Sequence, residues 1–138
     1  LPFHFSEDLE VIQRLQAEFG GRIHTLMERH SIQEILSVIH TMDLLVGVRL
    51  HALIFSAVAG TPLIALSYDP KIDYFMKAIG QSTFGAVKDF EPEQLTQGIL
   101  DKLDNTEADR ATLISAVEDL KSRLDINERE LVKLLGGK

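Results

Sequence analysis

The sequence predicts an α/β fold in which a Rossmann-like parallel sheet carries helices on both faces. Short apolar runs of strand length alternate with segments whose apolar residues recur at helical spacing, as in parallel α/β proteins. The run TPLIAL, residues 61–66, is nearly continuous in apolar character, which is typical of a strand buried on both faces. A chain of 138 residues is long enough for one hydrophobic core. We therefore expect a single Rossmann-like domain over residues 1–138.

The first elements follow this alternation. The opening LPFHF, residues 1–5, reads as the tail of a strand, and Ser6 is a suitable cap for a helix that ends at Gly20 and Gly21. The next run, RIHTL over residues 22–26, predicts a second strand. Ser31 and Glu34 then form an S-x-x-E capping box, which predicts that a helix begins there.

The middle of the chain repeats the pattern. Residues 44–46 predict a strand, residues 49–59 a helix and residues 61–66 the buried strand. The helix is expected to bury a stripe at positions i, i+3, i+4, i+7 and i+8, namely Leu50, Leu53, Ile54, Ala57 and Val58.

The remainder predicts mostly helices. Asp69 and Pro70 mark a turn before a short helix that ends at Gly80, and residues 84–90 include one more short strand. Pro92 suits the first position of a helix. From Thr106 onward a long helix is expected, with a stripe formed by Leu113, Val117, Leu120 and Leu124. The chain should therefore end in long helices.

Composition excludes several classes of function. The formal net charge of −7 argues against nucleic acid as a partner. The absence of cysteine removes disulfides, thiolate metal sites and thiol nucleophiles, and a cytoplasmic location fits, with or without peripheral attachment at the inner membrane face. No apolar run approaches the length of about 20 residues that a membrane span needs. Dinucleotide-binding, P-loop and zincin motifs are all missing, so no metal is expected.

Polar and basic residues follow the predicted strands. In a parallel sheet the carboxyl ends of the strands share one edge, where ligands bind. Helix amino-termini at that edge would add unpaired N–H groups, so we expect a small anionic ligand. The residues that follow the four strands in order are His4 and Ser6; Arg29, His30 and Ser31; Gly47, Arg49 and His51; and Ser67, Tyr68, Asp69 and Lys71.

The clearest of these groups is VGVRLH, residues 46–51. Arg49 and His51 lie off the expected apolar stripe and in the first turn of the predicted helix, so both can project toward the sheet edge. Gly47 would let a ligand approach the backbone. A guanidinium can grip a phosphate or carboxylate, and an imidazole can exchange a proton near neutrality. Taken alone, an arginine at a strand end is more often a salt-bridge or solvated residue than a ligand-binding one, His51 also suits a structural cap, and Asp69 before Pro70 is a standard turn residue.

The stretch DLLVGVRLHALIFSAVAGTPLIALSYDPKID, residues 43–73, resembles the polysaccharide pyruvyltransferase family, in particular its CsaB-like branch. LPFHFSEDLEV at the start is similar to the segment by which members of that family enter their carboxyl-terminal half. The resemblance implies the carboxyl-terminal half of a two-domain, GT-B-like enzyme. It also implies that the amino-terminal domain is absent from this chain, which would then be a fragment.

The implied activity is the transfer of pyruvate from phosphoenolpyruvate to a cell-wall or exopolysaccharide sugar as a ketal, with phosphate released. The implied partners are this donor and a glycan or lipid-linked sugar acceptor, and no cofactor is needed. Carried onto this sequence, the family's R-L-H motif makes His51 the catalytic acid or base, and its YDPK motif adds donor-pocket residues. The substrate-binding set is Arg49, Leu50, Gly47, Tyr68, Asp69, Lys71 and His4.

Two other readings remain open from the sequence. A GT-B glycosyltransferase or epimerase would use a nucleotide-sugar donor in the same kind of domain. A non-catalytic interaction module would use the long carboxyl-terminal helices to bind a partner. We expect the isolated chain to fold but to show little or no transferase activity, because it supplies one wall of a two-domain cleft.

Overall fold

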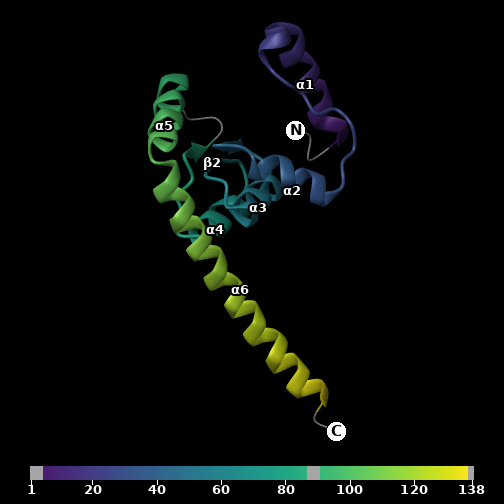
Figure 1. Cartoon of the computed structure of the whole chain (residues 1–138), viewed down its shortest axis with the longest axis vertical. Helices are drawn as coiled ribbons and strands as arrows, with labels where there is room; N and C mark the ends of the chain where they lie inside the picture. The colour runs from purple at the N-terminus through teal and green to yellow at the C-terminus, as the bar shows by residue number, and fades with distance from the viewer. Residues whose placement is uncertain (1–4, 87–90, 137–138) are drawn as a thin grey trace. The chain divides into compact units, whose positions relative to one another are not determined.

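A computed structural model describes residues 5–86 and 91–136. The chain divides into two compact units, residues 1–35 and residues 36–138, and each is described by itself. Figure 1 shows the course of the chain and the labels of its elements. Within the described residues, no helix has both the length and the apolar character that crossing a membrane requires.

The first unit contains a helix, α1 (Phe5–Phe19), followed by a 3-10 turn, η1 (Gly20–Arg22). The helix ends where the sequence predicts, because Gly20 adopts the left-handed conformation with φ of 55°. Arg22 belongs to this turn, and its guanidinium lies 5.3 Å from the centre of the Phe19 ring. The strand predicted at residues 22–26 is not formed, so that expectation is wrong. The strand expected at residues 1–5 falls largely outside the described residues, and Phe5 itself begins α1.

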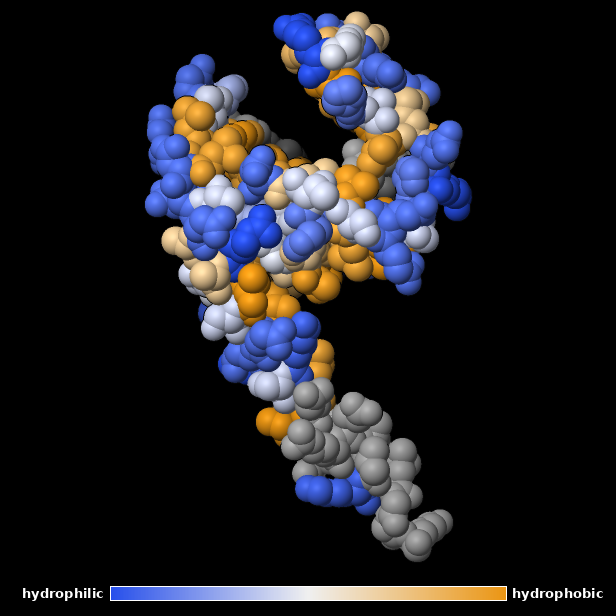
Figure 2. Space-filling view, viewed as in Figure 1, coloured by the Kyte–Doolittle hydropathy of each residue, from blue (hydrophilic) through white to orange (hydrophobic). Residues whose placement is uncertain are grey.

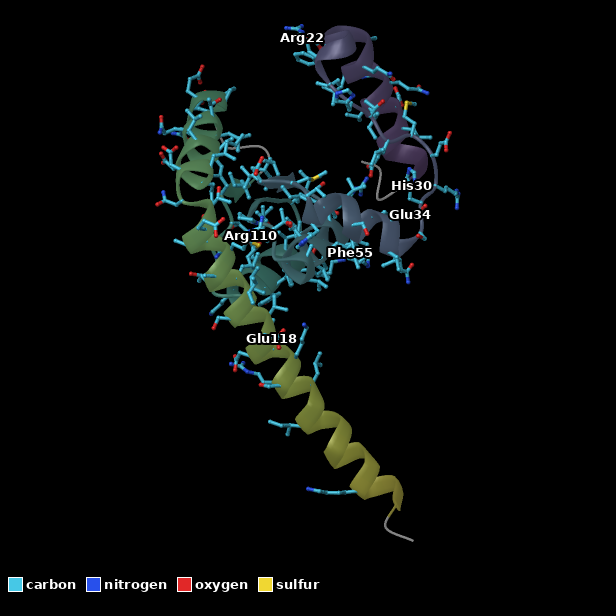
Figure 3. All side chains as sticks on the ribbon, viewed as in Figure 1. Arg22, His30, Glu34, Phe55, Arg110 and Glu118 are labelled. Carbon is cyan, nitrogen blue, oxygen red and sulfur yellow. The ribbon has the colours of Figure 1, made fainter. Side chains whose placement is uncertain are left out.

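Helix α2 (Ile32–His40) begins with the predicted capping box. Ser31 donates its backbone N–H to Glu34 Oε2 (2.8 Å), and its side-chain oxygen accepts from the Glu34 N–H (3.3 Å). The hydrogen bond from the Ser31 backbone, with one from its hydroxyl, lowers the pKa of Glu34, and the charge of His30 adds to the effect. Figure 3 shows the side chains of His30 and Glu34 at this end of α2.

The second unit is built on a three-stranded parallel sheet, in the order β1 (Leu45–Gly47), β2 (Leu63–Ser67) and β3 (Gly85–Ala86). All five residues of β2 are buried, as expected for a central strand of a parallel sheet. The structure confirms an α/β arrangement with a parallel sheet flanked by helices. The observed strands begin or end one or two residues away from the predicted limits.

Helix α3 (Leu50–Ala59) connects β1 to β2, and α4 (Pro70–Ala78) follows β2. Both connections are crossovers between parallel neighbouring strands, which is why the three strands point the same way. Gly60 ends α3 in the left-handed conformation with φ of 70°. The helices contribute the largest fully buried apolar side chains, namely Ile39, Leu53, Ile72, Met76, Ile79 just after α4, and Leu113.

Two helices close the chain, α5 (Pro92–Asp104), which has Pro92 in its first turn as predicted, and α6 (Thr106–Gly136). At 31 residues, α6 is about 46 Å long. Leu113 and Val117 of the predicted stripe are buried, whereas Leu124 is 65% exposed. Figure 2 shows apolar side chains at the surface of α5 and α6 among hydrophilic ones. The apolar stripe of α6 is therefore only partly used within this unit.

Candidate functional site

The carboxyl ends of β1 and β2 meet at one edge of the sheet. Gly47, the last residue of β1, pairs in register with Ala65 of β2, and β2 continues to Ser67. Each strand runs directly into a helix that begins within three residues. The topology therefore brings two of the predicted residue groups to the same edge, which we call the donor edge because the sequence predicts a donor site there. Its predicted members are Gly47, Arg49, Leu50, His51, Tyr68, Asp69 and Lys71.

Arg49 stands immediately before α3, with an extended backbone at φ −95° and ψ 125°. Its carbonyl oxygen accepts the first helical hydrogen bond, from Leu53 N–H at 3.2 Å. Its side chain makes no hydrogen bond that caps the helix and is half-buried. A cationic side chain thus occupies the position where Ser, Asp or Asn usually satisfies the N–H groups of the first turn. That combination of a guanidinium and helix N–H groups suits an anion.

His51 is the second residue of α3 and is exposed. Tyr68 at the end of β2 is also exposed, by 59%. Leu50, between Arg49 and His51, is half-buried, so it contributes to packing as well as to the donor edge. His51 therefore does not belong to the buried face of α3.

The buried face of α3 differs from the predicted stripe by about one residue. Ala52, Leu53, Ser56 and Ala57 are buried, whereas Val58 is 51% exposed, so the expectation for Val58 is wrong. The sequence pattern favours the large side chains of the stripe, but small residues let a helix approach a sheet closely. Here Ala52 and Ser56 face the interior. Val58 lies about 100° around the helix from the buried Ala57 and reaches the surface.

Gly47 has a packing role as well as its predicted functional one. A Cβ at this position would lie 3.0 Å from Leu45 Cδ2 and 3.3 Å from Leu53 Cδ2. The space beside Gly47 is therefore occupied by the side chains that join β1 to α3. A larger residue at this position would have to displace the ends of these two leucine side chains by a few tenths of an ångström.

Asp69 caps the second helix at the donor edge. Its Oδ1 accepts from Lys71 N–H at 2.9 Å, and its Oδ2 lies 3.2 Å from Lys71 Nζ. The backbone hydrogen bond from Lys71 is the main reason that the pKa of Asp69 is lowered, and the Lys71 side chain adds to it. The amino-terminus of α4 is thus capped by the carboxylate of Asp69, whereas the residue before α3 is the cationic Arg49.

Asp73, which sequence reasoning did not single out, braces the same edge. Its Oδ2 accepts from Ser67 Oγ at 2.8 Å, and its Oδ1 accepts from Thr83 Oγ1 at 3.0 Å. One carboxylate thereby joins the end of β2 to the segment that leads into β3. The sequence contains a signal for the contact between Asp73 and Ser67, because Ser67 ends a buried strand and Asp73 lies in the first turn of the next helix. It contains no local signal for the contact between Asp73 and Thr83.

The other predicted groups are not brought to this edge by a strand. His4 lies outside the described residues. Arg29, His30 and Ser31 were expected to follow a strand at residues 22–26 that the structure does not contain. Ser31 instead serves the capping box of α2.

A model of one protein family covers every member of the donor edge except Lys71. The family is described as polysaccharide pyruvyl transferase, and the match extends over residues 1–70 of the 138. The chain belongs to this family. In this pyruvyl transferase family member, the matched stretch includes Gly47, Arg49, Leu50, His51, Tyr68 and Asp69, while Lys71 follows directly after it. No curated protein and no solved structure matches the chain significantly.

Proposed function

We propose that this chain carries the donor site of a polysaccharide pyruvyl transferase, which transfers pyruvate from phosphoenolpyruvate to a glycan or lipid-linked sugar. Membership in the family supports the reaction class. The observation that carries the site is the placement of Arg49 directly before an α3 amino-terminus whose first turn presents an exposed His51. A phosphorylated carboxylic acid would meet a guanidinium and helix N–H groups together.

The reaction explains why an acid or base belongs beside an anion site. One sugar hydroxyl adds to C2 of the enol while C3 gains a proton and becomes a methyl group. A second hydroxyl then displaces phosphate from C2, which gives a cyclic ketal and inorganic phosphate. His51 is proposed to move the proton, because an imidazole titrates near neutral pH. Arg49 is proposed to hold the phosphate or the carboxylate.

Lys71 and Tyr68 are proposed to complete the donor pocket. The Lys71 side chain is 71% exposed beside Asp69, so its ammonium group can turn toward a ligand without leaving a buried carboxylate unpaired. Because the negatively charged Asp69 caps α4 and pairs with Lys71, the amino-terminus of α4 attracts an anion less strongly than the amino-terminus of α3 does. The donor is therefore proposed to sit closer to Arg49 than to Asp69. Acceptor groups are proposed to come from an additional domain, as the GT-B-like resemblance implies.

A titration of the 138-residue chain with phosphoenolpyruvate, followed by the backbone amide signals in NMR spectra, tests the donor site. The signals of Gly47, Leu50 and His51 should shift, and Arg49→Gln should weaken binding by about tenfold or more, which corresponds to about 1.4 kcal/mol. Arg123→Gln on the exposed side of α6 is the matched control. Shifts with UDP- or GDP-sugars in place of phosphoenolpyruvate would favour a nucleotide-sugar enzyme.

The role of His51 is separable from donor binding. His51→Gln should leave phosphoenolpyruvate binding nearly unchanged but abolish ketal formation in an enzyme that also has its acceptor site. Unchanged product formation by both Arg49→Ala and His51→Ala would contradict the proposal and favour a non-catalytic interaction module.

A further inference from the structure

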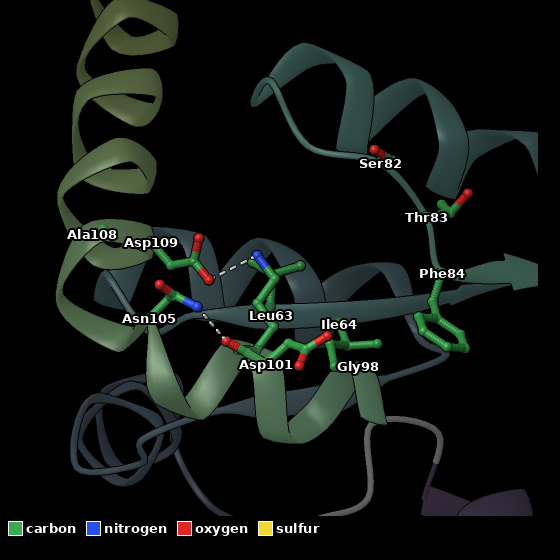
Figure 4. A pocket seen from close by; sticks show the side chains of 11 residues that line it. Leu63, Ile64, Ser82, Thr83, Phe84, Gly98, Asp101, Asn105, Ala108 and Asp109 are labelled. Carbon is green, nitrogen blue, oxygen red and sulfur yellow. Dashed lines mark hydrogen bonds and ion pairs between the residues drawn. The ribbon is translucent and has the colours of Figure 1, made fainter. Parts of the chain in front are cut away.

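The second unit contains a cavity of about 480 Å³ that includes none of the predicted site residues among those that line it. This volume is within the range of about 300–1,000 Å³ that small-molecule sites occupy. Figure 4 shows its walls. We call it the α5–α6 pocket, and it is lined by Leu63, Ile64, Ser82, Thr83, Phe84, Gly98, Asp101, Lys102, Asn105, Ala108 and Asp109.

One wall of the α5–α6 pocket is apolar. Leu63 and Ile64 come from the start of β2, and Phe84 comes from the segment before β3. The Phe84 ring lies against the backbone of α5, since a Cβ at Gly98 would be only 2.6 Å from Phe84 Cε2. Glycine at this helical position therefore allows an aromatic ring to form part of the wall.

The opposite wall is polar and comes from one face of two successive helices. Asp101, Lys102, Asn105, Ala108 and Asp109 recur at spacings of three and four, which places them on the same side. Lys102 Nζ lies 2.9 Å from Asp109 Oδ2 and also donates to Gln81 Oε1 at 3.2 Å. This ion pair is about three-quarters buried, so its two charges largely cancel within the pocket.

The remaining polar groups are mostly acceptors. Asn105 donates its Nδ2 to the backbone oxygen of Asp101 at 2.8 Å, which leaves its side-chain oxygen for a ligand. The Asp101 carboxylate accepts from Gln97 at 2.7 Å and has further acceptor capacity. The formal charge of the lining is −1, from two carboxylates and one ammonium group. Such a wall disfavours an anion and suits a ligand that donates several hydrogen bonds.

We propose that the α5–α6 pocket binds a neutral, polyhydroxylated ring, that is, a sugar residue. A sugar presents hydroxyl groups on its edge and C–H groups on its faces. The hydroxyls would meet Asp101, Asn105 and Asp109, and an apolar face would pack on Phe84 and Leu63. A sugar would therefore contact both the polar and the apolar wall. A phosphorylated donor is negatively charged and would be repelled by the two carboxylates of the polar wall.

The α5–α6 pocket adjoins the donor edge on one side, because its lining residue Thr83 donates to the Asp73 carboxylate that also accepts from Ser67. Its apolar wall begins at Leu63, at the other end of β2, about 13 Å from Ser67. A sugar packed against Leu63 would therefore belong to a part of the glycan other than the reacting residue. The assignment of the glycan as the source of that sugar rests on the proposed function, but the ligand class follows from the pocket alone.

The test is an NMR titration of the full 138-residue chain with a panel of neutral methyl glycosides and disaccharides. We expect the amide signals of Gly98, Asn105 and Ala108 to shift, while those of Gly47 and Lys71 stay in place. Ala108→Leu should fill the pocket and lower the affinity by about tenfold or more. Ala111→Leu, at another exposed position of α6, should leave binding unchanged and controls for the added side chain.

Failure of the panel to shift the pocket signals in a folded chain would overturn this inference. So would a shift produced by putrescine but by no glycoside, because the pocket would then be a cation site. Phosphoenolpyruvate is titrated in a separate arm, and its effect is measured at Gly47, Leu50 and His51. The donor proposal and the sugar proposal can therefore fail independently.

Discussion

Ser56 and Thr61 are joined by two hydrogen bonds that run in opposite directions. The Thr61 N–H donates to the Ser56 carbonyl oxygen at 2.9 Å, and Ser56 Oγ donates to the Thr61 carbonyl oxygen at 2.8 Å. Both residues are fully buried. The pair fixes the turn between α3 and β2, at the end of β2 opposite to the donor edge.

We expect Ser56→Ala to lower the free energy of unfolding by about 1–3 kcal/mol, because the Thr61 carbonyl loses its donor in a buried position. Urea unfolding followed by circular dichroism measures this change. Ser115→Ala on the exposed part of α6 is the control, since it carries the same gain in helix propensity without a buried partner. Equal stabilities of the two variants would show that the buried hydrogen bond contributes nothing.

Substitutions at Gly60 and Gly80 distinguish the energetic cost of backbone strain from that of a packing clash. Gly60 and Gly80 both have a positive φ, 70° and 69°. A Cβ at Gly60 would lie 3.2 Å from Ile114 Cγ1, whereas a Cβ at Gly80 would meet nothing within 4 Å. Gly80→Ala should therefore cost about 1–2 kcal/mol for the left-handed conformation, and Gly60→Ala should cost more. Thermal melting of both variants measures the difference, and a smaller effect at Gly60 would contradict the packing described for α6.

The stripe of α6 predicts contrasting effects along one helix. Leu113 is 2% exposed, so Leu113→Ala should lower the free energy of unfolding by about 2–5 kcal/mol. Leu124 is 65% exposed, so Leu124→Ala should change it by less than about 0.5 kcal/mol. Chemical unfolding of the two variants tests this. A large loss from Leu124→Ala would mean that this part of α6 is covered in solution.

The stability contributed by Asp69 should depend on pH. Its pKa is lower in the folded chain than in the unfolded one, so its contribution is complete above the unfolded value of about 3.9. The contribution is lost as the pH falls through the folded pKa. We expect Asp69→Asn to melt at a lower temperature than the native chain near neutral pH, and the difference to shrink below about pH 4.

A companion variant identifies the cause. Lys71→Met keeps the backbone N–H that donates to Asp69 and removes only the ammonium group. Because the backbone hydrogen bond is the larger influence on the pKa of Asp69, Lys71→Met should reproduce only a minor part of the effect of Asp69→Asn. Equal effects would assign the pKa shift to the ion pair instead.

Local signals predicted several elements of the fold well. The capping box at Ser31, Pro92 in the first turn of α5 and the apolar run that becomes β2 each act through groups a few residues apart, so the sequence contains them directly. The order of β1, α3, β2 and α4 was predicted for the same reason. The residues of the donor edge were placed together because parallel strands must share their carboxyl edge.

The predictions that were wrong concern features that depend on tertiary contacts, which a single sequence does not reveal. Residues 22–26 alternate like a strand, but a strand also needs a neighbour to pair with, and Arg22 is taken up by the 3-10 turn. Exposure of Val58 and Leu124 depends on which elements cover each helix face. The contacts of Asp73 and the α5–α6 pocket join segments that only the folded chain brings together.

The Asp73 carboxylate holds Ser67 and Thr83 through hydrogen bonds that the folded chain makes with itself. The conformational entropy of ordering this rim is therefore lost during folding and not again during binding. Under the proposed function, a donor molecule should accordingly associate with a preorganised rim, at a rate governed by diffusion and by charge attraction to Arg49.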